Sequence, residues 1–169
     1  MVVESDGATV FQRQFDVTFL AAGDSLARDS RVRIDVDSTY SGYSTRPLTD
    51  GVRDTTGVAW NEAAWASEES GGTHWVRITF PEPTTVQALS VYWNVEGGIT
   101  YTSRHGTVIG WTESGEKVVL GQFDNQKAVP LTRVGFDSRK LKAIELLQPP
   151  RGGSEPRPNL MWLSEIEVH

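Results

Sequence analysis

The sequence of 169 residues contains no cysteine, and this absence removes several kinds of chemistry at once. It excludes disulfide bonds, thiolate metal sites and a cysteine nucleophile. An extracellular location stays open, but a disulfide-stapled ectodomain of the animal type is not expected. The sequence also lacks any run of about 18 apolar residues, so no membrane-spanning helix is predicted.

Basic residues are in the minority, with 16 lysines and arginines against 22 aspartates and glutamates and a net charge of −6. This balance argues against nucleic acid as the main partner and against an anionic membrane surface. The chain has only three histidines, no Gly-x-Ser-x-Gly motif, no phosphate-cradling glycine loop and no His-x-x-x-His pair. We therefore expect no catalysis. A glycosidase built on two carboxylates is an alternative that the sequence does not exclude.

What the sequence does contain is short strands separated by turns. Six tryptophans, 16 glycines and eight prolines favour this pattern over long helices. Apolar residues alternate with polar ones in Val32–Val36 and in His74–Phe80, which predicts half-buried strands. Glu113–Glu116 has the composition of a hairpin turn between Thr107–Trp111 and Lys117–Leu120. About eight such strands predict an all-β antiparallel sandwich of the jelly-roll type.

Residues 1–27 differ from the rest. Thr9–Leu20 is rich in β-branched and aromatic residues, and Ala21–Ser25 then interrupts the pattern. We interpret residues 1–27 as a strand or linker from a preceding module and 28–169 as the main domain, with an edge strand of the main fold as the alternative. Residues 1–6 lack the basic and apolar segments of a signal peptide, and we expect the chain to be a piece of a larger protein.

The loop Leu48–Trp60 gathers acids, hydroxyl residues and glycines in a short space. Asp50–Gly51 is a turn dipeptide, and a tight turn directs carbonyl oxygens inward beside the carboxylate. An all-oxygen cage of this kind suits calcium, which takes about six to eight oxygen ligands. Ser164–Glu165, at the far end of the chain, is a candidate second contributor. The alternative is a solvated surface turn without a metal.

Several motifs in family order resemble a factor V/VIII type C (discoidin) domain and cover about residues 26–169. They are Leu26–Val32, Ser38–Tyr40, Thr49–Gly51, Ala59–Trp60, His74–Ile78 and Leu163–Val168. The same galactose-binding-like jelly roll is found in bacterial carbohydrate-binding modules of family 32. Animal members close the domain with a disulfide, so the absence of cysteine favours the bacterial branch.

The resemblance implies eight antiparallel strands and a structural calcium ion between the loop after the first strand and the last strand. Carried over by position, the side-chain ligands are Asp50, Thr55 and Glu165, and the carbonyl ligands are Pro47, Val52 and Ser164. The loop is longer than is usual in the family, so Asp54 or Thr56 is an alternative to Thr55.

Sugar binding requires an aromatic face that stacks on a pyranose and polar groups that bond its hydroxyls. In the resembled family these groups lie on loops at one end of the sandwich. Loop residues of these kinds are Tyr43, Glu62, Trp65, Tyr101, Arg104, His105 and Trp162. The strand pattern places four other tryptophans in the core, namely Trp60, Trp75, Trp93 and Trp111. The sequence pattern allows either a core or a surface position for Trp162. Arg104 also has two possible roles, because instead of binding a sugar it could cap a strand end through a salt bridge to Glu96.

The resemblance predicts a non-catalytic, monomeric carbohydrate-binding module from a secreted or cell-surface bacterial protein, beside a catalytic domain such as a glycoside hydrolase. Neither nucleic acid nor membrane insertion is expected. One alternative is a structural domain that packs on its parent enzyme without a ligand, which predicts that Tyr101–His105 is buried against a neighbouring domain. A discoidin-type adhesion module is the other alternative.

Overall fold

The computed structural model describes residues 2–5, 8–11 and 25–169. Strands β1 (Val2–Ser5) and β2 (Ala8–Phe11) pair as a small antiparallel sheet. β2 includes the start of the strand predicted at Thr9–Leu20, and residues 12–20 of that prediction lie outside the described residues. The assignment of residues 1–27 to a preceding module therefore stays a prediction.

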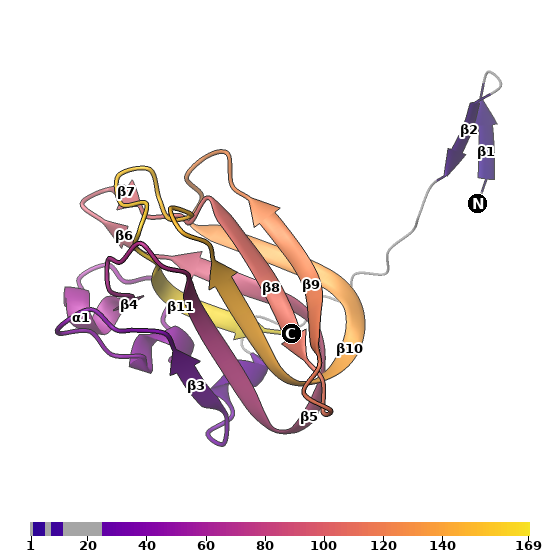
Figure 1. The fold of residues 1–169 in the computed structure, drawn as a ribbon. Coiled ribbons are helices and arrows are strands. Elements are labelled where there is room, and N and C mark those ends of the chain that lie inside the picture. The colour runs from indigo at the N-terminus through magenta and orange to yellow at the C-terminus, as the bar shows by residue number, and fades with distance from the viewer. Residues whose placement is uncertain (1, 6–7, 12–24) are drawn as a thin grey trace.

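Two long strands, β5 (His74–Trp93) and β10 (Leu131–Gln148), form the frame of the main domain. They pair antiparallel along three stretches that two β-bulges or irregularities separate. Ala143–Gln148 lies on His74–Thr79, Arg139–Leu141 lies on Thr84–Val86, and Leu131–Gly135 lies on Ala88–Tyr92. Bulges bend and twist a sheet. As a result the sheet folds over on itself, and each long strand contributes one half to each layer of a sandwich (Figure 1).

Shorter strands complete both layers. β3 (Arg33–Val36) pairs with the first half of β5, while β8 (His105–Trp111) and β9 (Lys117–Asp124) extend the second half of β10. In the other layer, β11 (Trp162–Val168) pairs with the second half of β5 and with β4 (Trp65–Ala66). Within residues 25–169 the two halves of β5 and of β10, with β3, β8, β9 and β11, make eight main strand segments. The predicted all-β antiparallel sandwich is confirmed.

The core lies between the two layers and follows the predicted alternation. His74, Val76, Ile78 and Phe80 are buried, whereas the residues between them are half-buried on the outer face. Trp93 is buried as predicted. The predicted hairpin between β8 and β9 is also confirmed, and Gly115 turns it with a φ of 83° that favours glycine.

Three of the four tryptophans predicted in the core are not there. Trp75 and Trp111 lie half-buried on the outer face, where the Arg77 guanidinium sits 5.0 Å from one ring and 4.4 Å from the other. Trp60 is exposed. Trp75 and Trp111 alternate with buried residues, so their strand register directs them outward, where a cation covers the rings.

Short elements and loops join the strands. They are η1 (Leu26–Arg28), η2 (Arg46–Thr49), α1 (Trp60–Ala63), β6 (Val95–Glu96) and β7 (Ile99–Thr100). Figure 1 shows α1, β4, β6 and β7 gathered at one end of the sandwich. In the part of the chain that the structure describes, no helix has the length and apolar character needed to cross a membrane.

Candidate functional site

Five aromatic rings meet at this end of the sandwich, and we call them the aromatic cluster: Tyr40, Tyr43, Trp60, Tyr101 and Trp162. Tyr43 lies at the centre, with ring centroids 4.8 Å from Trp60, 6.1 Å from Trp162 and 6.2 Å from Tyr40. The Tyr101 ring lies 4.7 Å from Trp162 on the other side. These edge and tilted contacts are favourable aromatic arrangements.

The cluster has a buried floor and an open rim. Trp162 begins β11 and is buried with Ala64, Ala66 and Leu160 beneath Tyr43 and Tyr101. Trp60 begins α1, and 52% of it is exposed. Gly42, at a φ of 88°, lies under the Trp60 ring, because a Cβ there would be 2.9 Å from Cη2 of the indole. The fold thus holds one indole in place while leaving much of it open to a ligand.

A pocket of about 470 Å³ opens beside Trp60, between the 53–60 loop and β6. Its volume is within the range of about 300–1,000 Å³ that is common for small-molecule sites. The residues that line it are Arg53, Asp54, Thr55, Thr56, Gly57, Val58, Trp60, Ala63, Asn94, Val95, Glu96 and Gly97. Exposed apolar side chains of Val58, Trp60 and Val95 are therefore interleaved with hydroxyl, amide and carboxylate groups. Exposed apolar groups gathered around a hollow mark a binding surface more than scattered ones do.

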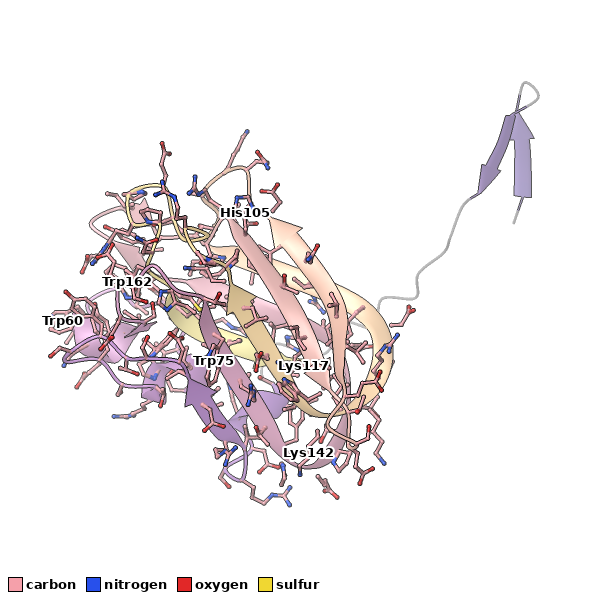
Figure 2. All side chains as sticks on the ribbon, in the orientation of Figure 1. Trp60, Trp75, His105, Lys117, Lys142 and Trp162 are labelled. Atoms are coloured by element: carbon pink, nitrogen blue, oxygen red, sulfur yellow. The ribbon has the colours of Figure 1, made fainter. Side chains whose placement is uncertain are left out.

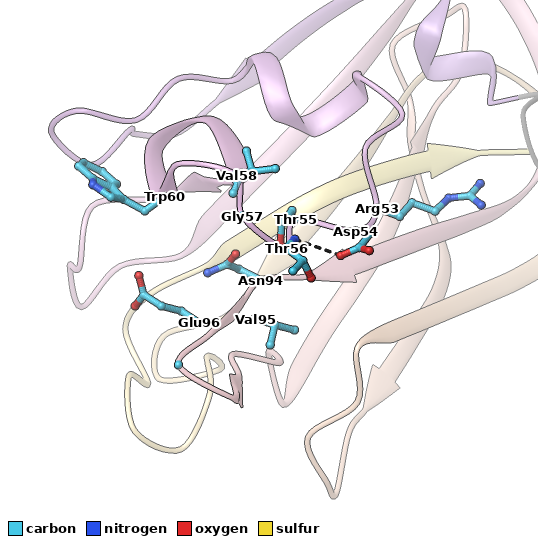
Figure 3. A pocket seen from close by; sticks show the side chains of 12 residues that line it. Arg53, Asp54, Thr55, Thr56, Gly57, Val58, Trp60, Asn94, Val95 and Glu96 are labelled. Carbon is cyan, nitrogen blue, oxygen red and sulfur yellow. Dashed lines mark hydrogen bonds between the residues drawn. The ribbon is translucent and has the colours of Figure 1, made fainter.

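Asn94 is the informative polar residue of this pocket. Its backbone N–H donates to the Trp162 carbonyl (3.1 Å) and its carbonyl accepts from the Tyr101 N–H (2.9 Å). The residue is only 4% exposed, yet its side-chain amide has no hydrogen-bond partner among the described residues. Figure 3 shows this amide directed, with the Glu96 carboxylate, toward the side of the pocket on which Trp60 lies. An amide that lines a pocket without a protein partner has its hydrogen bonds available for a ligand.

The arginines around the site form ion pairs with carboxylates, and the other charged groups at the pocket are negative. Arg157 donates to Glu69 and lies 5.8 Å from the Trp162 ring, and its hydrogen bond lowers the pKa of the Glu69 carboxyl. Arg53 lines the pocket, but Figure 3 shows its side chain pointing away from the other lining residues. Its Nε donates to Glu167 at 2.9 Å. The carboxylates of Asp54 and Glu96 remain at the pocket.

Burial, and secondarily the Glu96 carboxylate, raises the pKa of Tyr43 above its usual value. The phenol therefore stays protonated at neutral pH, and its O–H is a hydrogen-bond donor.

His74 joins three loops beneath the cluster. Its Nδ1 lies 2.8 Å from the Asp37 carboxylate, and its Nε2 lies 2.9 Å from the Asn159 carbonyl and 3.3 Å from the Ser70 carbonyl. The carboxylate and the two carbonyls are all acceptors, so the surroundings of the ring favour its protonated form, in which both nitrogens donate. Burial opposes this charge, but the hydrogen bond and charge of Asp37 outweigh it and raise the pKa of His74. These contacts tie together the segments that lead to Tyr40, Glu69 and Trp162.

The structure unites only part of the predicted sugar-binding set. Tyr43 and Tyr101 both contact Trp162, whose position is settled as the buried floor. Glu62 lies exposed on α1 but is not among the described residues that line the pocket. Trp65 is fully buried and its Nε1 donates to Thr39, so the prediction that it stacks on a sugar is wrong. It lies on β4 with its ring in the inter-layer core.

Arg104 and His105 lie elsewhere. Arg104 donates to the carbonyls of Gly153 (3.0 Å) and Arg151 (3.2 Å), so its guanidinium holds the 149–160 loop. His105 is exposed at the start of β8, with Nδ1 3.3 Å from Asp124, at a distance from Trp60 in Figure 2. Tyr101–His105 holds three of the predicted sugar-binding residues in five positions. Tyr101 belongs to the aromatic cluster, whereas His105 lies on another surface because β8 begins there.

Trp60 and Asn94 were not predicted as site residues. The strand pattern counted Trp60 as core, although its place after a long polar loop was a signal for exposure. Asn94 follows a strand directly and gave no signal of its own, because only the structure shows that its side chain is buried without a partner.

The two carboxylates among the expected calcium ligands, those of Asp50 and Glu165, are engaged by other groups in this arrangement. Both carboxylate oxygens of Glu165 already accept hydrogen bonds, Oε1 from Arg28 Nη2 (2.9 Å) and Oε2 from the Gly51 N–H (3.1 Å). Asp50 is exposed, and its Oδ1 accepts the Val52 N–H at 2.8 Å. Burial raises the pKa of Glu165 to about 7, against the opposing effect of Arg28. Within the described residues, no three or more His, Asp or Glu side chains are grouped to hold a metal.

Comparison with known proteins gives the fold its name. No family model and no curated protein matches the chain. Among solved structures, the lectin domain of lectinolysin complexed with Lewis B antigen matches with a TM-score of 0.69 and 16% identity, over 87% of this chain and 96% of that one. The chain has the galactose-binding-like fold.

Other structures with this fold are carbohydrate-binding modules. Chitosan-binding module 1 of a chitosanase/glucanase from Paenibacillus sp. IK-5 matches with a TM-score of 0.64 and 17% identity, over 86% and 98% of the two chains. The GH31 CBM32-2 module bound to GalNAc matches with a TM-score of 0.62 and 18% identity, over 83% and 99%. A GH29 fucosidase from Ruminococcus gnavus also matches (TM-score 0.66, 15% identity, 86% of this chain), but over only 26% of its own length.

Proposed function

We propose that this chain is a non-catalytic carbohydrate-binding module that holds a glycan at the aromatic cluster and the adjoining pocket. The observation that carries the proposal is the pairing of the half-exposed Trp60 indole with the Asn94 amide, which lines the same pocket and makes no side-chain hydrogen bond to the described residues. An indole face suits the C–H face of a pyranose, and a fixed amide both donates to and accepts from sugar hydroxyls. The similarity in fold to lectin domains and carbohydrate-binding modules supports the proposal.

We further propose that the preferred sugars are neutral or carry an amine. The pocket carries the Asp54 and Glu96 carboxylates, while the one lining guanidinium, that of Arg53, is engaged by Glu167. An acidic sugar would bring a like charge to these carboxylates and leave its own charge without a partner, and such juxtapositions are unfavourable.

In the organism, we propose that the chain is one module of a secreted or cell-surface glycoside hydrolase or related enzyme. The support is that some proteins of this fold are parts of much larger enzymes, as in the fucosidase. In this arrangement the module supplies affinity for the glycan, and the neighbouring catalytic domain acts on it at a raised effective concentration.

The test is a glycan array probed with the full chain, followed by calorimetry on the glycan that binds best. Neutral and amino sugars are expected to bind, and sialylated or sulfated glycans are not. Asn94→Ala is expected to weaken binding by roughly 3- to 10-fold, since it removes hydrogen bonds worth about 0.5–1.5 kcal/mol. Val119→Ala is the matched control, because Val119 is 63% exposed on β9, outside the pocket lining. If no glycan binds, the structural accessory domain becomes the better explanation. If binding is unchanged in Asn94→Ala, the site is not this pocket.

A further inference from the structure

Two buried carboxylates stand next to each other on the closing strand. Glu165 is fully buried and Glu167 is 2% exposed, and both belong to β11. As residues two apart on a strand, they point to the same face of the sheet. Buried carboxylates are stable only when opposite charge and hydrogen bonds compensate them.

Arg28, at the end of η1, supplies the first compensation. Its Nη2 donates to Oε1 of Glu165 (2.9 Å) and to Oε1 of Glu167 (2.7 Å), and its Nε lies 3.3 Å from the same Glu165 oxygen. The guanidinium therefore bridges the two carboxylates. A forked, charge-assisted contact of this type is among the stronger hydrogen bonds in proteins.

Arg53, in the loop after η2, supplies the second. Its Nε donates to Oε1 of Glu167 at 2.9 Å, and its guanidinium lies 5.2 Å from the Tyr92 ring. The Tyr92 hydroxyl donates to the other Glu167 oxygen at 3.2 Å. When both carboxylates are ionised, these two guanidinium groups set two positive charges against their two negative ones.

The position of the guanidinium is enforced by the loop that was expected to bind calcium. Gly51 has a φ of 87°, and a Cβ at this residue would lie 3.2 Å from Cζ of Arg28. The Gly51 N–H donates to Glu165 from the same side. The arginine therefore fills the space between the Asp50–Gly51 turn and Glu165, and a divalent cation placed there would face its positive charge.

We propose that Arg28, Arg53, Glu165 and Glu167, which we call the arginine clasp, take the place of the calcium ion in this chain. The clasp joins the 50–53 loop to β11, the two segments that the ion was expected to join, and adds η1 to them. Stability of the domain is accordingly independent of calcium. This inference does not rest on the proposed sugar site, which lies on other residues apart from Arg53.

The experiment is thermal unfolding of the full chain in EDTA and in excess CaCl₂, with calcium titration by calorimetry. A pH of about 8 keeps Glu165 ionised and gives calcium its best opportunity to bind. The melting temperature is expected to be the same in both conditions to within about 1 °C, because a ligand that does not bind adds no stability. Arg28→Ala is expected to lower it by roughly 6 to 20 °C, because breaking a buried pair leaves a carboxylate uncompensated.

Asp50→Ala is the matched control, since Asp50 is an expected calcium ligand that makes no part of the clasp. The proposal predicts a change of only about 1 to 2 °C for Asp50→Ala, the range of a surface substitution. If Arg28→Ala yields no folded protein, Arg28→Lys replaces it as the test variant. Lysine keeps the positive charge but not the forked hydrogen bonds, so the melting temperature of Arg28→Lys is expected to lie below that of the wild type and above the value expected for Arg28→Ala. A calcium-dependent rise of more than about 3 °C in the wild type, or one-to-one calcium binding, overturns the clasp. An unchanged melting temperature in both Arg28 variants also overturns it.

Discussion

Replacing Trp60 with alanine is the sharpest test of the proposed glycan site. A tryptophan side chain presents up to about 250 Å² of surface. Because Trp60 is 52% exposed, about 130 Å² of it is open to a ligand. A pyranose that covers half of this area removes about 65 Å² of apolar surface from water, worth about 1.6 kcal/mol. We therefore expect Trp60→Ala to raise Kd roughly 15-fold, and more if the sugar covers the whole face.

The assay is isothermal titration calorimetry with the best-binding glycan, beside a thermal unfolding curve for each variant. Trp60 contributes little to the core, so the melting temperature is expected to change by only about 1 to 4 °C. Trp60→Phe keeps a smaller aromatic face and is expected to bind with an intermediate Kd. Gly42→Ala is also expected to weaken binding, because its Cβ would lie 2.9 Å from Cη2 of the indole and displace the ring. The φ of 88° at this residue strains alanine as well, so the unfolding curve of this variant is expected to shift to lower temperature. An unchanged Kd in Trp60→Ala, with the protein folded, refutes the stacking argument.

Two further predictions concern stability. The raised pKa of His74 means that its contribution to stability is complete below its ordinary pKa of about 6.5 and is lost as pH rises through the folded-state pKa. Melting temperature is therefore expected to fall as pH rises above about 6.5, and His74→Gln is expected to flatten this fall. An equally steep profile in the variant contradicts a stabilising contact between the protonated ring and Asp37. Trp65→Ala empties a fully buried position and is expected to cost about 3–5 kcal/mol in unfolding free energy, measured by urea denaturation. A loss below about 1 kcal/mol would place Trp65 outside the core.

The sequence alone predicted the architecture well, because strand periodicity and turn composition are local signals. The alternation in His74–Phe80 located a core strand, and Glu113–Glu116 located a hairpin. The resemblance in six short motifs led to the galactose-binding-like fold, which the structure and its neighbours confirm. The absence of cysteine settled from the start that no disulfide contributes to stability.

The site was predicted only in part, because residue type does not reveal which side of a loop faces solvent. Tyr43 and Tyr101 were predicted and meet at Trp162, but Trp60 and Trp65 exchanged their expected roles. Trp60 begins the short helix α1 and Trp65 follows that helix on β4, so the direction of each ring depends on how this segment packs against the sandwich. Asn94 is informative only because the fold buries it and leaves its amide without a partner.

The two ends of the chain show the same division between sequence and tertiary structure. From sequence, Asp50–Gly51 and Ser164–Glu165 were two oxygen-rich segments predicted to share a cation, and their proximity is what the structure shows, with the Gly51 N–H on Glu165. The identity of the positive charge was beyond sequence reasoning, because Arg28 and Arg53 are far from Glu165 along the chain and ordinary on a protein surface. Only the folded chain brings their guanidinium groups to the buried carboxylates. A buried carboxylate without an opposite charge is strongly destabilising, so a positive group must lie beside it.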